Sequence, residues 1–198
     1  MSAPGPVAGD AHLVERFLDS EVRLSGGFLT VVRDRVQLPD GGVATREYVR
    51  HPGAVAVVPI RDDGRLVLVR QYRHPVGRVL LEWPAGKIDP GEDVLACAAR
   101  ELREETGYTA RLWARAGVFH NACAYSDEGI EIWLARGLCE GAASLDAGEF
   151  VEVALHDPAD LQSLVMAGAI TDMKTALGVL WLQQWRCGAW SPDWRELR

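Results

Sequence analysis

The segment from Gly86 to Gly107, GKIDPGEDVLACAARELREETG, constrains the fold more than any other part of this sequence. It opens with a turn at residues 89–91, because proline presets φ and glycine accepts a positive φ. Asp93 is a good helix N-cap and Gly107 a good C′ residue, so we expect a helix from Asp93 to Thr106. One face of this helix is apolar and should be buried; it carries Val94, Leu95, Ala98 and Leu102.

Three glutamates crowd the C-terminal half of the same predicted helix. Glu101 and Glu105 are spaced so that they lie one above the other, with Glu104 beside them. Each such pair of like charges costs about 0.2–0.5 kcal/mol, and the carboxylates also oppose the helix dipole. Arg100 and Arg103 offset part of this cost, whereas a divalent cation would offset all of it. Carboxylates on one rigid face suit a hard ion such as Mg²⁺; the alternative is a charged face that is simply solvated.

The main body of the chain is predicted to be a mixed α+β sandwich. The segments GAVAVVPI at 53–60 and RLVLVRQY at 65–72 are nearly continuous apolar runs, which is typical of buried strands, and RDDG between them is a hairpin signal. Further strands are expected at residues 79–83, 130–137 and 150–156.

Two helices are predicted in the last part of the chain. The first begins with Asp157 as N-cap and Pro158 at the first helical position, and Gly168 stops it. The second follows from apolar residues at helical spacing within residues 171–188.

The N-terminal part has a different pattern. We expect a frayed tail over residues 1–10, a β region over 11–50 and one main domain over 51–198. In the β region, GFLTVVRDRVQL alternates apolar and polar residues, and the PDGG turn at 39–42 precedes a second strand, VATREYVR.

Composition limits the kinds of binding partner and the cellular compartment that we expect for this protein. A net charge of −7 argues against non-specific binding to nucleic acid or to an anionic membrane. The apolar runs are shorter than the roughly 18 residues of a membrane span, and the N-terminus resembles no signal peptide. The 4 cysteines form no C-x-x-C pair, which favours a reducing cytoplasm. Neither zinc spacing of the histidines nor a G-K-[ST] phosphate loop is present.

The spacing G-x5-E-x7-R-E-L-x-E-E-x-G, from Gly86 to Gly107, resembles the box of the Nudix hydrolases. Tyr108 departs from the usual aliphatic residue and can fill the same apolar slot. The resemblance implies an α/β/α sandwich with a mixed sheet and hydrolysis of a nucleoside diphosphate linked to another group. It implies that Glu92 and Arg100 pair to hold the loop, and it gives Mg²⁺ as the cofactor, with Mn²⁺ as the alternative. The residues that it assigns to the metal are Ala85 through its carbonyl, Glu101, Glu105 and Glu149.

Several segments outside the box are similar to the ADP-ribose pyrophosphatase branch of this family, among them VRQYRHPVG, LEWPAGKIDPGED, YSDE and GEFVEV. This similarity implies an intertwined homodimer in which the N-terminal sheet completes the partner's site. It implies that Arg46 and Arg73 contact the phosphates or ribose and that Glu82 accepts from the adenine amino group. Ser126 and Glu128 of YSDE would also bind substrate. Solvated strand edges for the arginines, and a plain turn for YSDE, are the alternatives.

The resemblance makes Glu104, Glu105 and Glu149 the candidate catalytic acids, and one departure affects them. The branch usually has an acid two residues before Glu149, where this chain has Ala147. A methyl group cannot accept a proton, so Asp146, Glu149 or a glutamate of the box would have to serve as the base.

The sequence therefore favours a Mg²⁺-dependent ADP-ribose pyrophosphatase that releases AMP and ribose 5-phosphate. A Nudix hydrolase of another nucleotide-sugar, of NADH or of a damaged nucleotide is the first alternative. The second is a non-catalytic domain that senses ADP-ribose, which Ala147 makes conceivable.

Overall fold

A computed structural model describes residues 9–27 and 29–197 and divides the chain into two compact units. The first unit contains the chain up to His51 together with Ala122–Glu128, and the second contains Pro52–Asn121 and the part from Gly129 onward. The short segment from Ala122 to Glu128 thus belongs with the N-terminal strands, although it follows them by a long stretch of sequence. The two units are described in turn.

The first unit is built on a three-stranded antiparallel sheet with the order β1-β2-β3. Its elements are the short 3₁₀ helix η1 (Asp10–His12) and the strands β1 (Arg16–Ser25), β2 (Thr30–Gln37) and β3 (Val43–Arg50). The turn predicted at 39–42 is present, with Leu38 N donating to Gly42 O at 2.8 Å and Gly41 at φ 88°. The predicted tail lies outside the described residues except for Gly9 and Asp10, and Asp10 already begins η1.

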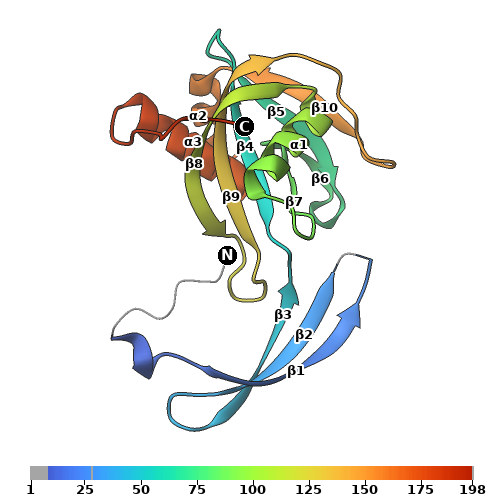
Figure 1. Cartoon of the computed structure of the whole chain (residues 1–198), viewed down its shortest axis with the longest axis vertical. Coiled ribbons are helices and arrows are strands. Elements are labelled where there is room, and N and C mark those ends of the chain that lie inside the picture. The colour runs from blue at the N-terminus through green and yellow to red at the C-terminus, as the bar shows by residue number, and fades with distance from the viewer. Residues whose placement is uncertain (1–8, 28, 198) are drawn as a thin grey trace. The chain divides into compact units, whose positions relative to one another are not determined.

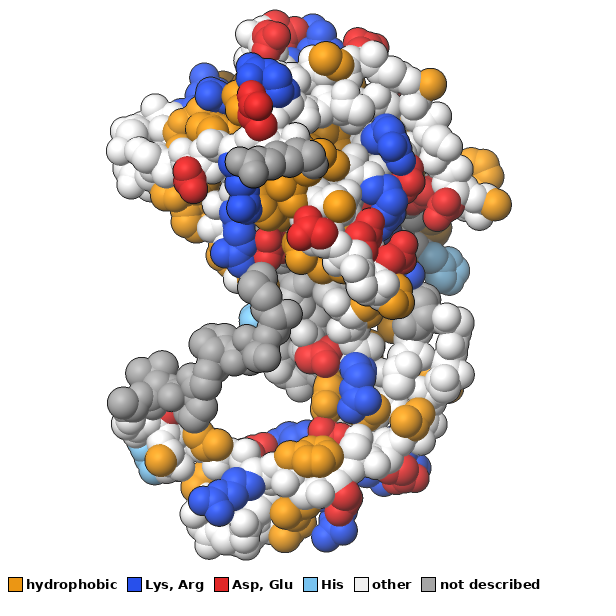
Figure 2. Space-filling model, viewed as in Figure 1, with side chains coloured by type: hydrophobic (Ala, Val, Ile, Leu, Met, Phe, Trp, Pro, Cys, Tyr) orange, Lys and Arg blue, Asp and Glu red, His pale blue; other side chains and the backbone are white. Residues whose placement is uncertain are grey.

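The two outer strands of this sheet differ from the middle one in burial. Along β2, Val32 and Val36 are buried, with Asp34 buried between them, where Tyr48 Oη donates to its carboxylate at 3.0 Å. Every residue of β1 is exposed, including large apolar ones. Figure 2 shows apolar side chains among the charged ones on this unit.

The second unit is organised around a mixed sheet of eight strands. Its main path runs β10-β5-β4-β9-β8-β11, while β6 pairs with β5 and β7 pairs with β4. The strands are β4 (Ala54–Ile60), β5 (Leu66–Arg73), β6 (Arg78–Glu82), β7 (Ala85–Lys87), β8 (Thr109–His120), β9 (Gly129–Cys139), β10 (Val151–His156) and β11 (Arg195–Glu196), with the 3₁₀ helix η2 (His74–Val76) after β5. The pairing of β4 with β9 is parallel and the other pairings are antiparallel.

Helices cover both faces of this sheet, which confirms the predicted sandwich (Figure 1). The helices are α1 (Val94–Thr106), α2 (Pro158–Met166) and α3 (Met173–Arg186). The apolar run of β4 explains why, since its side chains alternate between two cores. Ala56 and Val58 pack in the core that holds α2 and α3, whereas Val55 and Val57 pack in the core that holds α1. Among the described residues, no helix is long and apolar enough to cross a membrane.

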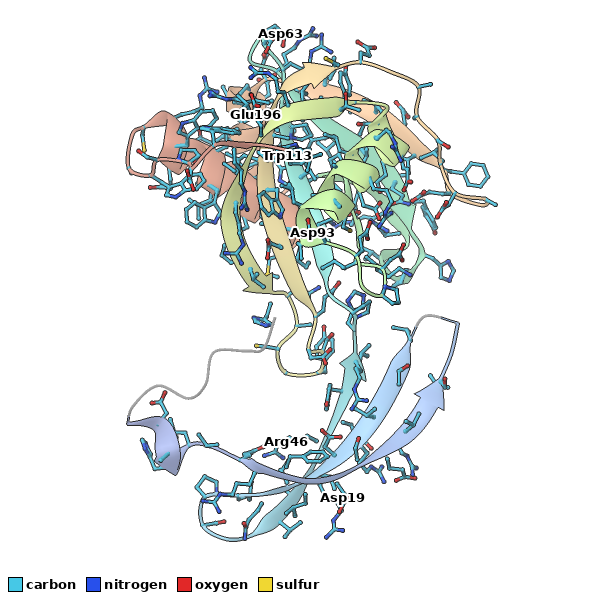
Figure 3. The ribbon with its side chains drawn as sticks, viewed as in Figure 1. Asp19, Arg46, Asp63, Asp93, Trp113 and Glu196 are labelled. Atoms are coloured by element: carbon cyan, nitrogen blue, oxygen red, sulfur yellow. The ribbon has the colours of Figure 1, made fainter. Side chains whose placement is uncertain are left out.

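Helix α1 begins and ends where the sequence predicts. The Asp93 carboxylate accepts from Leu95 N at 3.0 Å and from Ala96 N at 3.1 Å (Figure 3 labels Asp93), and Gly107 closes the helix at φ 76°. This cap fixes the direction of α1 and therefore the face on which its glutamates lie.

Strand β8 was not predicted from the sequence. It has 12 residues, and its side chains do not alternate cleanly, because Trp113 and Ala114 are both buried and a register shift separates Arg115 from Gly117. A bulge of this kind moves the side chains that follow it to the opposite face, which obscures the period of two.

Candidate metal and diphosphate site

The first part of the candidate site is the contact between the start of β7 and the glutamates of α1. Ala85 N donates to Glu105 Oε2 at 3.1 Å. A Cβ at Gly86 would lie 2.0 Å from the Glu101 carboxylate, so only glycine leaves room for that carboxylate against the backbone. The glycine of the box therefore acts here by allowing a close approach.

Burial and mutual repulsion raise the pKa values of these carboxylates, which disfavours their charged forms unless a cation is bound. The pKa of Glu105 is raised to about 8, chiefly by burial; the charges of Glu101 and Glu149 contribute to this rise, and the hydrogen bond from Ala85 N opposes it. Burial also raises the pKa of Glu101, to which Glu104 and Glu149 add, while Arg100 opposes them. Glu149 therefore lies close enough for its charge to act on both helix residues.

Arg100 connects the loop to the acidic face of α1. Its Nε and Nη2 donate to Glu92 at 2.8 and 2.9 Å, and its Nη1 donates to Glu101 at 2.8 Å and to Glu104 at 3.1 Å. The pair of Glu92 and Arg100 that the sequence predicts is thus present. The hydrogen bond from Arg100 holds the pKa of Glu92 down at about 2, although burial opposes this shift.

The oxygen donors gathered here fit a hard divalent cation. The absence of a side chain at Gly86 leaves the Glu101 carboxylate against the backbone, and burial raises the pKa of both Glu101 and Glu105, so that a cation bound there would favour their charged forms. Among residues 9–27 and 29–197, no three His, Cys, Asp or Glu side chains already converge on one point as metal ligands. Glu101 and Glu104 are instead bound to Arg100, which supplies a positive charge.

The loop before β10 brings Glu149 to this region. Glu149 is half-buried, Gln71 Nε2 of β5 donates to its carboxylate at 3.3 Å, and Asp146 N donates to it at 3.4 Å. Ala147 is exposed in the same loop, which leaves space for a longer side chain.

Arg73 and Glu82 form a second feature next to the glutamates. Arg73 donates through Nε at 2.8 Å and through Nη2 at 2.9 Å to the two oxygens of Glu82, which is buried. The charge of Arg73 also acts on Glu105, where it lowers the pKa that burial raises. Lys174 of α3 donates to Glu82 as well, and the sequence analysis did not foresee this residue. No local pattern could have done so, because 92 positions separate the two partners.

The other three predicted substrate residues belong to the first unit. Arg46 lies on β3 (Figure 3) and donates through Nε to Glu15 at 3.0 Å. Ser126 Oγ accepts from Glu128 N at 3.2 Å, which is the turn that the sequence left as the alternative. The Glu128 carboxylate lies 3.5 Å from the His51 ring nitrogen Nδ1. The substrate-binding roles of Arg46, Ser126 and Glu128 stay predictions.

Comparison with known proteins also divides the chain into an N-terminal part and a main part. The family model described as NUDIX domain matches residues 50–177, and the model described as nucleoside diphosphate sugar hydrolase N-terminal domain matches residues 15–49. An ADP-ribose pyrophosphatase of Bacillus subtilis (strain 168) is 39% identical over 173 residues, which cover 86% of this chain and 94% of that protein. A methanol dehydrogenase activator of Bacillus methanolicus is 39% identical over 171 residues, with coverages of 85% and 92%.

A solved structure agrees with these sequence relatives. The crystal structure of an ADP compounds hydrolase superposes with a TM-score of 0.78 and 25% identity, and the match covers 88% of this chain and 95% of that one. The NUDIX match covers strands β4 to β10, α1 and the loop that carries Glu149. On this match and on relatives that align over most of its length, the chain belongs to the Nudix family.

Proposed function

We propose that this protein is a metal-dependent pyrophosphohydrolase that converts ADP-ribose to AMP and ribose 5-phosphate. The observation that carries the proposal is the position of Glu101 and Glu105 against the Ala85–Gly86 backbone, with Glu149 close enough for its charge to act on both. The 39% identity to an ADP-ribose pyrophosphatase over most of the chain supports the choice of substrate.

The metal would be held by the carboxylates of Glu101, Glu105 and Glu149 and by the Ala85 carbonyl. These are oxygen donors, for which Mg²⁺ is the natural ion and Mn²⁺ the alternative. When bound, such an ion neutralises charge on the diphosphate and lowers the pKa of a bound water.

The protein's own groups would orient the substrate and handle the proton. Arg73 has five N–H donors, of which Glu82 engages two, so the guanidinium retains donors for a phosphate. Arg46, Ser126 and Glu128 are the proposed further contacts to substrate. The proton of the attacking water would pass to Glu149, Glu104 or Glu105, because Ala147 has no acceptor in its side chain.

We also propose that two copies associate through the first unit. Large apolar side chains of β1 are exposed, among them Phe17 at 64%, Val22 at 57% and Leu24 at 54%. A strand of this kind at the edge of a three-stranded sheet favours association, since a small sheet is marginal by itself. The branch resemblance would then bring Arg46 to a shared site.

A reducing cytoplasm is the proposed location. Cys97, Cys123, Cys139 and Cys187 are all free thiols, and three of them are exposed. Exposed free thiols fit a compartment in which disulfides do not persist.

The test of the proposed function is turnover of ADP-ribose by the purified protein with Mg²⁺, with AMP and ribose 5-phosphate resolved by chromatography.

Glu105→Gln keeps the shape of the side chain and removes one proposed metal ligand. Turnover should fall about 10²-fold or more, because a bound ion supplies several kcal/mol of transition-state stabilisation. The melting temperature in a chelator should not fall, since burial already disfavours the charged form of Glu105 and a neutral amide of the same shape replaces it. Survival of turnover within a few-fold at saturating Mg²⁺ would contradict the metal role of Glu105.

The same assay separates the alternatives. Faster release of a nucleoside monophosphate from another nucleotide-sugar or from NADH would reassign the substrate within the family. A domain that only senses ADP-ribose is favoured by Ala147, and binding of ADP-ribose without any release of AMP would establish that alternative.

A further inference from the structure

The carboxylate of Glu82 is buried between two cations from different parts of the second unit. Its side chain is 1% exposed, Arg73 of β5 binds both of its oxygens, and Lys174 of α3 donates to Oε2. Burial tends to raise the pKa of Glu82, but the hydrogen bond from Arg73 and the charge of Lys174 outweigh it and hold the pKa below its usual value. Glu82 is therefore an anion that accepts three hydrogen bonds, which leaves little capacity for a further donor such as an adenine amino group.

The backbone on both sides of this contact is fixed by neutral hydrogen bonds. Trp83 N donates to Thr175 Oγ1 at 3.1 Å, and Trp83 Nε1 donates to Thr175 O at 3.0 Å. Thr175 in turn donates through its amide to Asp172, the N-cap of α3, at 2.9 Å. A Cβ on Gly178 would lie 2.2 Å from the Trp83 indole, so the ring packs directly on the helix backbone. The N-terminal part of α3 and the segment from Glu82 to Trp83 are therefore joined by direct backbone and side-chain contacts.

Asp172, the N-cap of α3, holds Lys174 in place. Asp172 Oδ1 accepts from Lys174 Nζ at 3.0 Å, and the Lys174 side chain is only 12% exposed. Asp172, Lys174, Glu82 and Arg73 thus form one continuous chain of alternating charges that begins at a helix cap. Only the last member is open to a ligand, because the Arg73 side chain is 39% exposed.

Resting on the function proposed above, the geometry points to Lys174 as a positioning residue that acts through Glu82 to present the guanidinium of Arg73 to the substrate's diphosphate. A bidentate pair fixes the plane of a guanidinium only if the carboxylate cannot rotate. Lys174 prevents that rotation by holding Oε2 from the helix side. It also neutralises part of the charge of Glu82, so that more of the positive charge of Arg73 acts on an anionic ligand.

The test is a comparison of Lys174→Met with a matched control, Arg78→Met. Arg78 Nη2 donates to Thr171 Oγ1 at 2.7 Å, so the control also removes a cation that joins β6 to the segment before α3, but not one that touches Glu82. Lys174→Met should raise KM for ADP-ribose about tenfold, because the guanidinium of Arg73 would no longer be held in one orientation toward the diphosphate, with little change in kcat. Arg78→Met should leave both constants unchanged.

A double-mutant cycle distinguishes positioning from a general structural role. Dissociation constants of ADP-ribose and of ADP are measured by calorimetry in a chelator for wild type, Lys174→Met, Arg73→Ala and the double variant. If Lys174 acts through Arg73, Lys174→Met weakens binding in wild type and has no effect once Arg73 is removed. Equal weakening in both backgrounds would overturn the inference, as would no weakening at all. Should Lys174→Met fail to fold, Lys174→Leu, which likewise removes the donor to Oε2, takes its place in the cycle with the same expectations.

These measurements distinguish failure of the positioning role from failure of the proposed hydrolase function. Wild-type protein that binds ADP-ribose in a Lys174-dependent manner but releases no AMP would contradict the hydrolase and leave the positioning role standing. If the wild-type protein hydrolyses ADP-ribose but substitution of Lys174 changes neither KM nor the dissociation constant, the positioning role alone would be overturned. Failure of wild type to bind either ADP-ribose or ADP in the chelator, together with no release of AMP from ADP-ribose in the presence of Mg²⁺, would overturn both.

Discussion

The lack of a side chain at Gly86 decides where the Glu101 carboxylate can lie. In Gly86→Ala, the added Cβ would lie 2.0 Å from that carboxylate, which sits at the end of a flexible side chain and can move away. We expect a small loss of stability, about 1 kcal/mol or less, together with a large loss of affinity for Mg²⁺. Titration of turnover against Mg²⁺, beside thermal melting in a chelator, measures the two effects separately. A variant with wild-type Mg²⁺ dependence would show that Glu101 is not held in place by this contact.

At the scale of elements, the ion pair of Glu92 and Arg100 fastens the loop before α1 to the helix. The pKa of Glu92 is about 2 in the folded protein and near 4.5 ordinarily, so the ionised form stabilises the fold. This stabilisation is complete above about pH 4.5 and is lost as the pH falls toward 2. Glu92→Gln should cost about 1–3 kcal/mol at pH 7, and the difference from wild type should shrink steadily below pH 4.5.

Urea denaturation at intervals from pH 7 to pH 3 checks this expectation. The control is Glu152→Gln, which removes a carboxylate that pairs with Arg70 at an exposed site, with its side chain 69% exposed. An exposed pair contributes little, so the control should stay within about 1 kcal/mol of wild type throughout. A deficit in Glu92→Gln that persists unchanged at pH 3 would mean that shape, and not charge, is what Glu92 contributes.

The loop before β10 is the second element on which a prediction depends. Ala147→Glu adds an acid where Ala147 is exposed, two residues before Glu149. General-base assistance is worth about 10²–10⁴-fold, so turnover should rise, mainly through kcat. Glu149→Gln should lower turnover strongly, whether Glu149 binds metal or accepts the proton. Steady-state kinetics of both variants checks this, and an unchanged Ala147→Glu beside a near wild-type Glu149→Gln would place catalysis entirely within α1.

For the whole molecule, the exposed apolar side chains of β1 lead to a prediction about assembly. We expect sedimentation velocity at micromolar concentration to show a dimer. Val22→Lys should shift it toward monomer, because a charge would have to be buried in place of an apolar side chain. Arg33→Lys on the neighbouring strand β2 changes no charge and should leave the dimer intact. A wild-type protein that sediments as a fully active monomer would contradict this proposal.

How far the sequence predicts the structure differs between local and distant features. Helix α1 could be predicted residue by residue, because the cap at Asp93, the apolar spacing and the stop at Gly107 are all local signals. Strand β4 could be predicted because a strand buried on both faces is apolar throughout. Strand β8 could not, since its bulge near Gly117 hides the alternation that marks a strand.

The candidate site also combines features that local sequence determines with features that depend on tertiary packing. The sequence by itself determined the face that Glu101 and Glu105 share, because a fixed offset along one helix specifies it, whereas the pairing of Glu92 with Arg100 was implied by the family resemblance. Only the tertiary structure decided that Lys174 reaches Glu82. That contact joins residues far apart in the chain, and its energy comes from compensating a buried charge, which depends on how the sheet and α3 pack and not on any local pattern.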